Sequence, residues 1–206
     1  MLNTIVKVSH ITNLSDARYC AGMGVEMVGF MGDETAENYM PLKKFQEIRS
    51  WISGVKIVLE TTESDIEKIV ERSQLYEPDM IQVSDYKQLA WLKAELNIPI
   101  VLRVEATQDA DEIEGVMHQN ETYVSYFLIE SEEDVELDAD WYVLLDNLAQ
   151  KYKILVGLSM APEGVIKLLN TTPQIGIALH GSDEIRPGYK DFGKLMDILE
   201  VLEELN

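Results

Sequence analysis

The chain has 206 residues, enough for one well-packed domain and short for two, and its 46% hydrophobic and 26% charged residues are typical of a globular protein. The excess of 37 acidic over 17 basic residues gives a formal net charge of −20, which argues against nucleic acid and anionic membranes as partners. No run of about 20 apolar residues occurs, and the N-terminus lacks a basic-then-apolar export signal, so we expect a cytoplasmic protein that does not contact membranes.

Short apolar strands alternate with helices of 3.6-residue apolar spacing along the whole chain. We expect strands at 4–9, 26–31, 54–60, 79–84, 99–105, 123–130, 153–158 and 174–180. We expect helices near 15–23, 41–52, 63–75, 85–96, 108–119, 140–150, 162–169 and 190–205. Asp16 and Pro162 suit helix starts, and Gly54 and Asn97 suit helix ends.

This alternation predicts the fold class. Strands that alternate strictly with helices form parallel sheets with right-handed crossovers, and eight such units close into a barrel. We therefore predict an α/β protein, a compact (β/α)8 TIM barrel forming a single domain over residues 1–206. A doubly wound open sheet is the alternative, but it usually has fewer strands and a glycine-rich first turn, which "SHITNL" is not.

Polar residues recur at the strand ends with the parity that points into a barrel, where the reactive groups of such folds gather. If Ser9 points inward, the same parity selects Lys7, Glu60, Gln82, Ser84, Arg103, Glu105, Glu130 and His180. An internal salt-bridge network could explain Lys7 and Arg103, but it would leave the three glutamates with too few partners. We therefore expect a small-molecule ligand at the barrel mouth.

A metal site is a weaker alternative at the same place. Glu60, Glu105, Glu130 and His180 offer ligands suited to magnesium or manganese, supported only by their inward parity. No cofactor and no metal are expected for the preferred interpretation below.

Several stretches together resemble one family. They are "VKVSHITNLSDARYCAGMGVEMVGF", "DMIQVS", "ADW", "KILVGLSMAPEGV" and "GIALHGSDEIRPGYKDFGKL", and they run from the first strand to the last helix in barrel order. The chain resembles the phosphoribosylanthranilate isomerase family. The resemblance implies an Amadori aldose–ketose isomerisation in tryptophan biosynthesis, without a cofactor. That chemistry needs a base for a C–H proton, an acid for the ring oxygen and a phosphate anchor.

The resemblance places the catalytic pair at Ser9 and Glu130. Ser9 stands where the family has its cysteine base, and because an alkoxide is too basic to form near neutral pH, any activity should be weak. Glu130 stands at the family's acid position and could act if the site raises its pKa. His10 replaces a family glycine, and its opposite parity predicts an imidazole that points away from the barrel axis.

The binding positions implied by the resemblance also differ from the family. Asn38 stands in the loop where an arginine meets the anthranilate carboxylate. The phosphate loops correspond to Gly157, Leu158 and Ser159 after the seventh strand and to His180, Gly181 and Ser182 after the eighth. Leu158 should add bulk there and Asp183 and Glu184 negative charge, which leaves the Gly181 amide and a protonated His180 to hold an anion. The inward Lys7, Gln82, Ser84 and Arg103 are further candidates for substrate binding.

Two functions remain open from the sequence. The whole-chain resemblance and Glu130 favour an isomerase of this family that binds a phosphorylated sugar. The changes at Ser9, Asn38, Leu158–Ser159 and His180 favour a diverged paralogue, either non-catalytic or specific for another small molecule. Either protein could be a monomer or a homodimer.

Overall fold

The computed structural model describes residues 2–106, 109–131, 133, 135, 137–181, 184–186, 189–190 and 193–204, with backbone alone for 184–186, 189, 190 and 194. Its centre is a closed barrel of eight parallel strands that neighbour one another in chain order. The strands are β1 (Val6–Ser9), β2 (Met27–Met31), β3 (Lys56–Glu60), β4 (Met80–Val83), β5 (Ile100–Glu105), β6 (Tyr126–Glu130), β7 (Ile154–Gly157) and β8 (Gly176–His180). The predicted TIM barrel is confirmed, and the open sheet is excluded.

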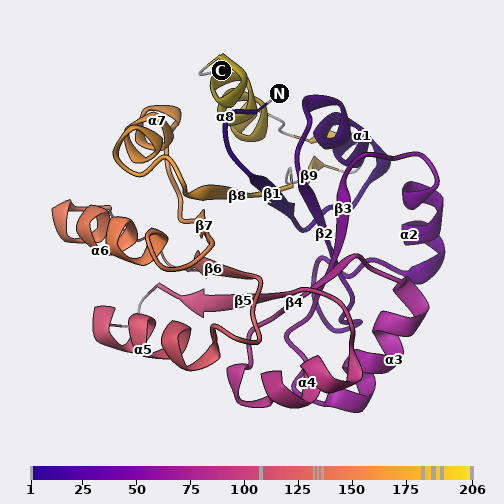
Figure 1. Cartoon of the computed structure of the whole chain (residues 1–206). Coiled ribbons are helices and arrows are strands. Elements are labelled where there is room, and N and C mark those ends of the chain that lie inside the picture. The colour runs from indigo at the N-terminus through magenta and orange to yellow at the C-terminus, as the bar shows by residue number, and fades with distance from the viewer. Residues whose placement is uncertain are drawn as a thin grey trace.

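The helices form a ring outside the strands (Figure 1). They are α1 (Leu14–Met23), α2 (Leu42–Arg49), α3 (Ile66–Tyr76), α4 (Leu89–Glu95), α5 (Ala110–Asn120), α6 (Ala139–Ala149), α7 (Pro162–Thr171) and α8 (Gly193–Glu204). The first and last described segments meet beside the barrel, where the amide of Asn3 donates to the carbonyl of Leu202 of α8 at 3.3 Å.

Short polar side chains start several of these helices. The carboxylates of Asp65, Asp109 and Asp138 accept hydrogen bonds from backbone amides in the first turns of α3, α5 and α6. Helix α1 begins in the same way at Asn13, whose Oδ1 accepts from the amide of Asp16 at 2.9 Å. Each cap satisfies an amide that has no partner within its own helix. Asp16 therefore lies in the first turn of α1 rather than at its start.

The apolar core has two layers. The outer layer packs between the strands and the helices, and the inner layer fills the barrel with Met27, Val58, Met80, Val101, Leu128, Leu155 and Ala178. Strand β1 contributes a charged residue to this inner layer, because Lys7 lies opposite Met27 on β2 and Ala178 on β8. The inner layer is therefore apolar on strands β2 to β8 and carries a lysine on β1.

Two glycines make room for acidic side chains above the inner layer. A Cβ at Gly29 would lie 2.0 Å from Glu60 Oε1, and a Cβ at Gly157 would lie 3.2 Å from Glu130 Oε1. The register places Glu130 directly opposite Gly157. Both glutamates therefore enter the barrel over positions where a neighbouring strand has no side chain.

The structure differs from the predicted elements mainly in the loops. Between β8 and α8 it contains an antiparallel hairpin, β9 (Glu184–Arg186) and β10 (Tyr189–Lys190), which the sequence did not indicate. The helix predicted over 85–96 is a short 3-10 helix, η1 (Tyr86–Gln88), followed by α4. Within the described ranges, no helix is both long enough and apolar enough to cross a membrane.

Candidate active site

A buried charged cluster joins β1 to β3 inside the barrel. Lys7 is fully buried, and its ammonium group donates to Ser9 Oγ at 2.5 Å and to Glu60 Oε1. The second oxygen of Glu60 accepts the backbone N–H of His10 at 3.0 Å. Burial favours a neutral Glu60, but the charges of Lys7 and His10 and the hydrogen bonds from both residues together outweigh burial and lower the pKa of this carboxyl. Lys7 and Glu60 are therefore a charged pair, and Ser9 is one of the groups that hold Lys7.

A second cluster joins β5, β6 and β8. Glu130 accepts from Arg103 Nε at 3.0 Å and lies 2.7 Å from His180 Nε2 through its other oxygen. Arg103 Nη2 also pairs with Glu105 at 3.0 Å. The three glutamates at the mouth all have cationic partners in these two clusters. The expectation that they lack partners is therefore wrong.

Glu130 lies among cationic side chains. Burial alone would raise its pKa, but the hydrogen bond from His180 and the charges of His180, Lys7 and Arg103 outweigh burial and lower the pKa to about 2. The acid role predicted for Glu130 requires a raised pKa, and the structure gives the opposite direction. Glu130 is thus an ionised carboxylate at neutral pH.

His10 does not point away from the mouth as the strand parity predicted. Its φ of 57° lies in the left-handed region, so the chain turns sharply after Ser9 and the alternation of side chains ends there. Its ring lies edge to face with the ring of His180, with centroids 4.8 Å apart, and its Nε2 is 3.8 Å from Glu60 Oε2. The comparison with the family could have predicted this turn, because the family has glycine at the position of His10, and glycine adopts such a φ without strain.

The two histidines have pKa values shifted in opposite directions. Burial lowers the pKa of His10, and the attraction of Glu60 does not compensate for burial and the nearby charges of His180 and Lys7. The hydrogen bond to Glu130 raises the pKa of His180 above its ordinary value of 6.5, although burial opposes it. At a given pH, His180 is therefore protonated to a greater extent than His10.

The expected phosphate loops are arranged differently from the prediction. Leu158 is buried in the outer core, so it does not add bulk at the mouth, while Ser159 beside it is exposed. The amide of Gly181 donates to the carbonyl of Ser9 at 2.7 Å and is not free for an anion. Gly181 fits there because a Cβ would lie 3.0 Å from the carbonyl oxygen of His10. Ser182 and Asp183 lie outside the described residues.

The other predicted binding residues lie around the same end of the barrel. Gln82 is buried on β4, opposite Glu60, and its Oε1 has no hydrogen-bond partner among the described residues. Ser84 follows β4 directly, and Asn38 lies partly exposed in the loop between β2 and α2. A buried acceptor without a donor is costly, so Gln82 Oε1 is an exception among the buried polar atoms described.

The described part of the chain contains no group of three or more His, Cys, Asp or Glu residues arranged to hold a metal ion. The four residues considered for magnesium or manganese are divided between the two clusters, where Glu60 faces Lys7, and Glu130 faces Arg103 and His180. The arrangement does not support the metal alternative.

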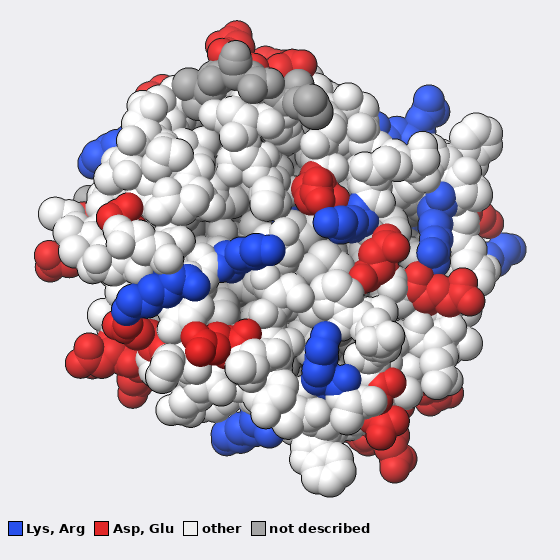
Figure 2. All heavy atoms as spheres, in the orientation of Figure 1, with Lys and Arg blue, Asp and Glu red and all other residues white. Residues whose placement is uncertain are grey.

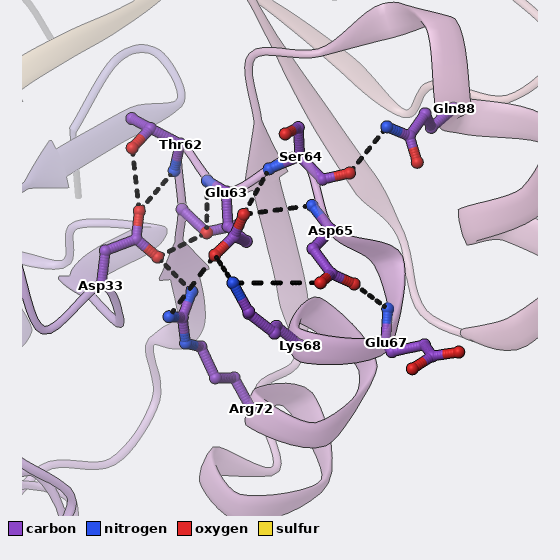
Figure 3. Close-up of polar contacts among 10 residues, drawn as sticks. Asp33, Thr62, Glu63, Ser64, Asp65, Glu67, Lys68, Arg72 and Gln88 are labelled. Carbon is purple, nitrogen blue, oxygen red and sulfur yellow. Dashed lines mark hydrogen bonds and ion pairs between the residues drawn. The ribbon is translucent and has the colours of Figure 1, made fainter.

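A polar network holds the loop after β3 beside the mouth. Asp33, in the loop after β2, accepts from Thr61 Oγ1 at 2.6 Å, from the amide and hydroxyl of Thr62, and from Arg72 of α3 at 2.5 Å (Figure 3). Glu63 continues the network to the amides of residues 64 and 65 and to Lys68 (Figure 3). These bonds tie two neighbouring mouth loops to one helix.

The surface charge is mixed on the face seen in Figure 2, where Lys and Arg side chains lie beside Asp and Glu side chains. On that face the excess negative charge is not collected into a single patch.

The barrel and the polar mouth define a class of protein: a TIM-barrel protein whose reactive groups gather at the carboxyl ends of the strands, as in enzymes of this fold. A sequence profile of the N-(5'-phosphoribosyl)anthranilate (PRA) isomerase family matches residues 6–201. The chain belongs to this family.

Individual relatives match over almost the whole length. The N-(5'-phosphoribosyl)anthranilate isomerase of Petrotoga mobilis is 24% identical over 97% of both chains, and that of Methanocaldococcus jannaschii is 25% identical over 97% of both. Among solved structures, the phosphoribosylanthranilate isomerase of Thermotoga maritima aligns with a TM-score of 0.79 at 17% identity, covering 98% of this chain and 99% of its own. A structure of such an isomerase in complex with reduced 1-(o-carboxyphenylamino)-1-deoxyribulose 5-phosphate aligns with a TM-score of 0.78.

Proposed function

We propose that the chain catalyses the isomerisation of N-(5'-phosphoribosyl)anthranilate, the aldose–ketose rearrangement for which its family is named. The observation that carries the proposal is the whole-length family match together with a mouth that keeps ionisable groups at the ends of β1, β6 and β8. The curated relatives reported above are named as isomerases, which does not favour the alternative of a non-catalytic paralogue. A cytoplasmic location suits a step in tryptophan biosynthesis.

The substrate's sugar would lie over the two clusters. Gln82 Oε1 would accept a hydroxyl or the anilino N–H of the substrate, which would satisfy the acceptor that lacks a partner in the described residues. Lys7 and Arg103 are already paired with glutamates, so we assign them the role of fixing Ser9, Glu60 and Glu130 rather than of direct binding. Ser84 lies at the end of β4, beside Gln82, where a second substrate hydroxyl could bind.

The two anionic ends of the substrate would extend outward from this centre. Asn38 would hydrogen-bond the anthranilate carboxylate from the loop after β2, without adding a charge. Phosphate would lie near Gly157 and Ser159, where glycine lets the backbone approach closely. His180 is a weak phosphate anchor because Glu130 compensates its charge at 2.7 Å.

The oligomeric state is proposed as monomer or homodimer. The T. maritima relative is a dimeric protein that has also been solved as monomers. The mouth described above is built from one chain, so neither state changes the proposed site.

Genetic complementation tests the proposal. A tryptophan auxotroph that lacks this isomerase should grow without tryptophan when it expresses the chain, even at a low turnover rate. The matched control is Glu130→Ala, which removes the centre of the second cluster and should abolish growth at equal soluble expression. A strain that accumulates folded wild-type chain and still requires tryptophan would refute the proposed function.

A further inference from the structure

The two groups expected to transfer protons are poorly placed to do so. Ser9 is 1% exposed, and its oxygen accepts a hydrogen bond from the Lys7 ammonium group at 2.5 Å. Glu130 has an 8% exposed side chain, holds Arg103 and His180, and has a pKa of about 2 that keeps it ionised. A neutral hydroxyl is a poor base, and an ionised carboxylate has no proton to give near neutral pH.

Two histidine rings lie at the same mouth in positions a ligand can reach. The side chain of His10 is 28% exposed and that of His180 is 50% exposed. The left-handed backbone at His10 brings its ring over Glu60 and against His180, so residues from β1 and β8 meet above the barrel. Glu130 fixes Nε2 of His180, which leaves Nδ1 as the nitrogen for proton transfer to a ligand.

We propose that His10 is the general base and His180 the general acid of the isomerisation, with Glu60 and Glu130 as their positioning residues. The inference rests on the proposed function and names the groups that perform it.

The protonation states required by these roles agree with the electrostatics of the mouth. The charged groups that face the pair are Glu60 of β3, Lys7 of β1 and Glu130 of β6, and each histidine also faces the other. Their combined effect, with burial, is a lowered pKa for His10 and a raised pKa for His180. Paired groups whose pKa values are pushed apart are a common arrangement for acid and base roles.

The reaction can be balanced with these two residues alone. The His180 imidazolium gives its proton to the ribose ring oxygen while the C1–O bond breaks, and the anilino nitrogen lone pair forms C1=N. Neutral His10 takes the C2 proton, so the C2–H electrons form C1=C2 and the C1=N electrons return to nitrogen. His180 then takes the enol proton from the C2 oxygen as C2=O forms, and His10 returns a proton to C1. Both residues recover their starting states, and no atom is gained or lost.

The variant His10→Gly separates catalysis from folding. Glycine suits the left-handed φ of 57°, so this variant should fold at least as well as the wild type. Loss of a general base typically costs about 10²- to 10⁴-fold, so we expect kcat/KM to fall at least ~100-fold. His10→Asn, which also tolerates this backbone conformation, should fall equally. The matched control is His118→Gln on exposed α5, the third histidine of the chain, which should keep the wild-type rate.

The pH dependence of kcat/KM distinguishes these roles from a structural effect. For the wild type, kcat/KM should rise with increasing pH as His10 loses its proton, at a pH below 6.5. It should fall again at a pH above 6.5, as His180 loses its proton. His10→Asn should lose the acidic limb of the profile, and His180→Gln should lose the alkaline limb. Glu130→Gln should move the alkaline limb to lower pH, because it removes the carboxylate that raises the pKa of His180.

The outcomes separate the two proposals. A wild-type chain that converts substrate, with His10→Gly at the wild-type rate, overturns the histidine pair and returns the base role to Ser9 while the proposed function stands. An active wild type whose limbs both survive in His10→Asn and His180→Gln overturns the pair as well. A folded wild type without turnover refutes the proposed function, and the assigned roles with it.

Discussion

The buried ion pair between Lys7 and Glu60 permits a direct test of how the inside of the barrel is held together. Both side chains are fully buried, and Glu60 has as its other close donor the amide of His10 at 3.0 Å. Lys7→Met removes the cation and leaves an ionised carboxylate in the barrel. Breaking a buried pair from one side costs about 3–5 kcal/mol, because the remaining charge has lost its compensation.

This cost should appear as a large shift in thermal unfolding. For a chain of this length, 1 kcal/mol corresponds to about 2–4 °C in Tm, so Lys7→Met should lower Tm by roughly 6–20 °C at pH 7. The matched control is Lys56→Met, which removes an exposed Lys–Glu pair of 2.7 Å with Glu26 and should cost at most about 1 kcal/mol. The assay is circular dichroism during heating, with urea unfolding as a second measure of the free energy.

The double variant Lys7→Met/Glu60→Gln completes the test. It replaces both charges, so it should be more stable than Lys7→Met alone, because no unpaired charge remains in the barrel. A loss for Lys7→Met no larger than for Lys56→Met would contradict a buried charged pair, as would losses from Lys7→Met and Glu60→Gln alone that simply add in the double variant.

Further predictions concern the loops, the core and the second cluster. Asp33→Ala should lower the free energy of unfolding by about 2–4 kcal/mol in urea, because it removes the carboxylate that accepts hydrogen bonds from Arg72 and from two threonines, whereas the exposed neighbour Glu34→Ala should change it by less than about 0.5 kcal/mol. Leu128→Ala should cost about 2–5 kcal/mol by opening a cavity in the inner layer, and a loss below about 1 kcal/mol would contradict that packing. Because the pKa of Glu130 is lowered to about 2, its carboxylate stabilises the fold above pH 4.5 by about 3 kcal/mol and loses this effect as pH falls toward 2; Glu130→Gln should therefore show a flatter decline over that range, and an equal decline would contradict the shift. Ser9→Cys should leave kcat within about threefold if His10 is the base, whereas a tenfold rise would place the base at position 9.

The strand pattern predicted the fold and most of the mouth because barrel strands alternate strictly between inside and outside. Lys7, Gln82 and Glu130 all lie where their parity placed them. Parity could not show the pairing, which depends on register: Glu60 is held by a lysine on β1, 53 residues away in the sequence. For this reason, the expectation that the three glutamates have too few cationic partners was wrong.

Parity failed where the chain leaves the extended conformation. The left-handed backbone at His10 turns the His10 side chain back over the mouth. Strict alternation assumes an extended backbone, so it cannot predict this orientation. At Leu158 the alternation was sufficient, since Leu155 lies in the inner layer and the third residue after it faces outward. Comparison with the family's glycine led instead to the incorrect expectation of bulk at the mouth.

Isomerisation of the sugar of N-(5'-phosphoribosyl)anthranilate at this barrel mouth can be followed by ¹³C NMR of the purified chain with freshly prepared substrate. We expect the anomeric C1 signal to disappear and a C2 ketone signal to grow at a rate proportional to the concentration of the chain, and His118→Gln should match the wild type. If the substrate binds but its anomeric C1 signal is lost no faster than in buffer alone, the proposed function is refuted.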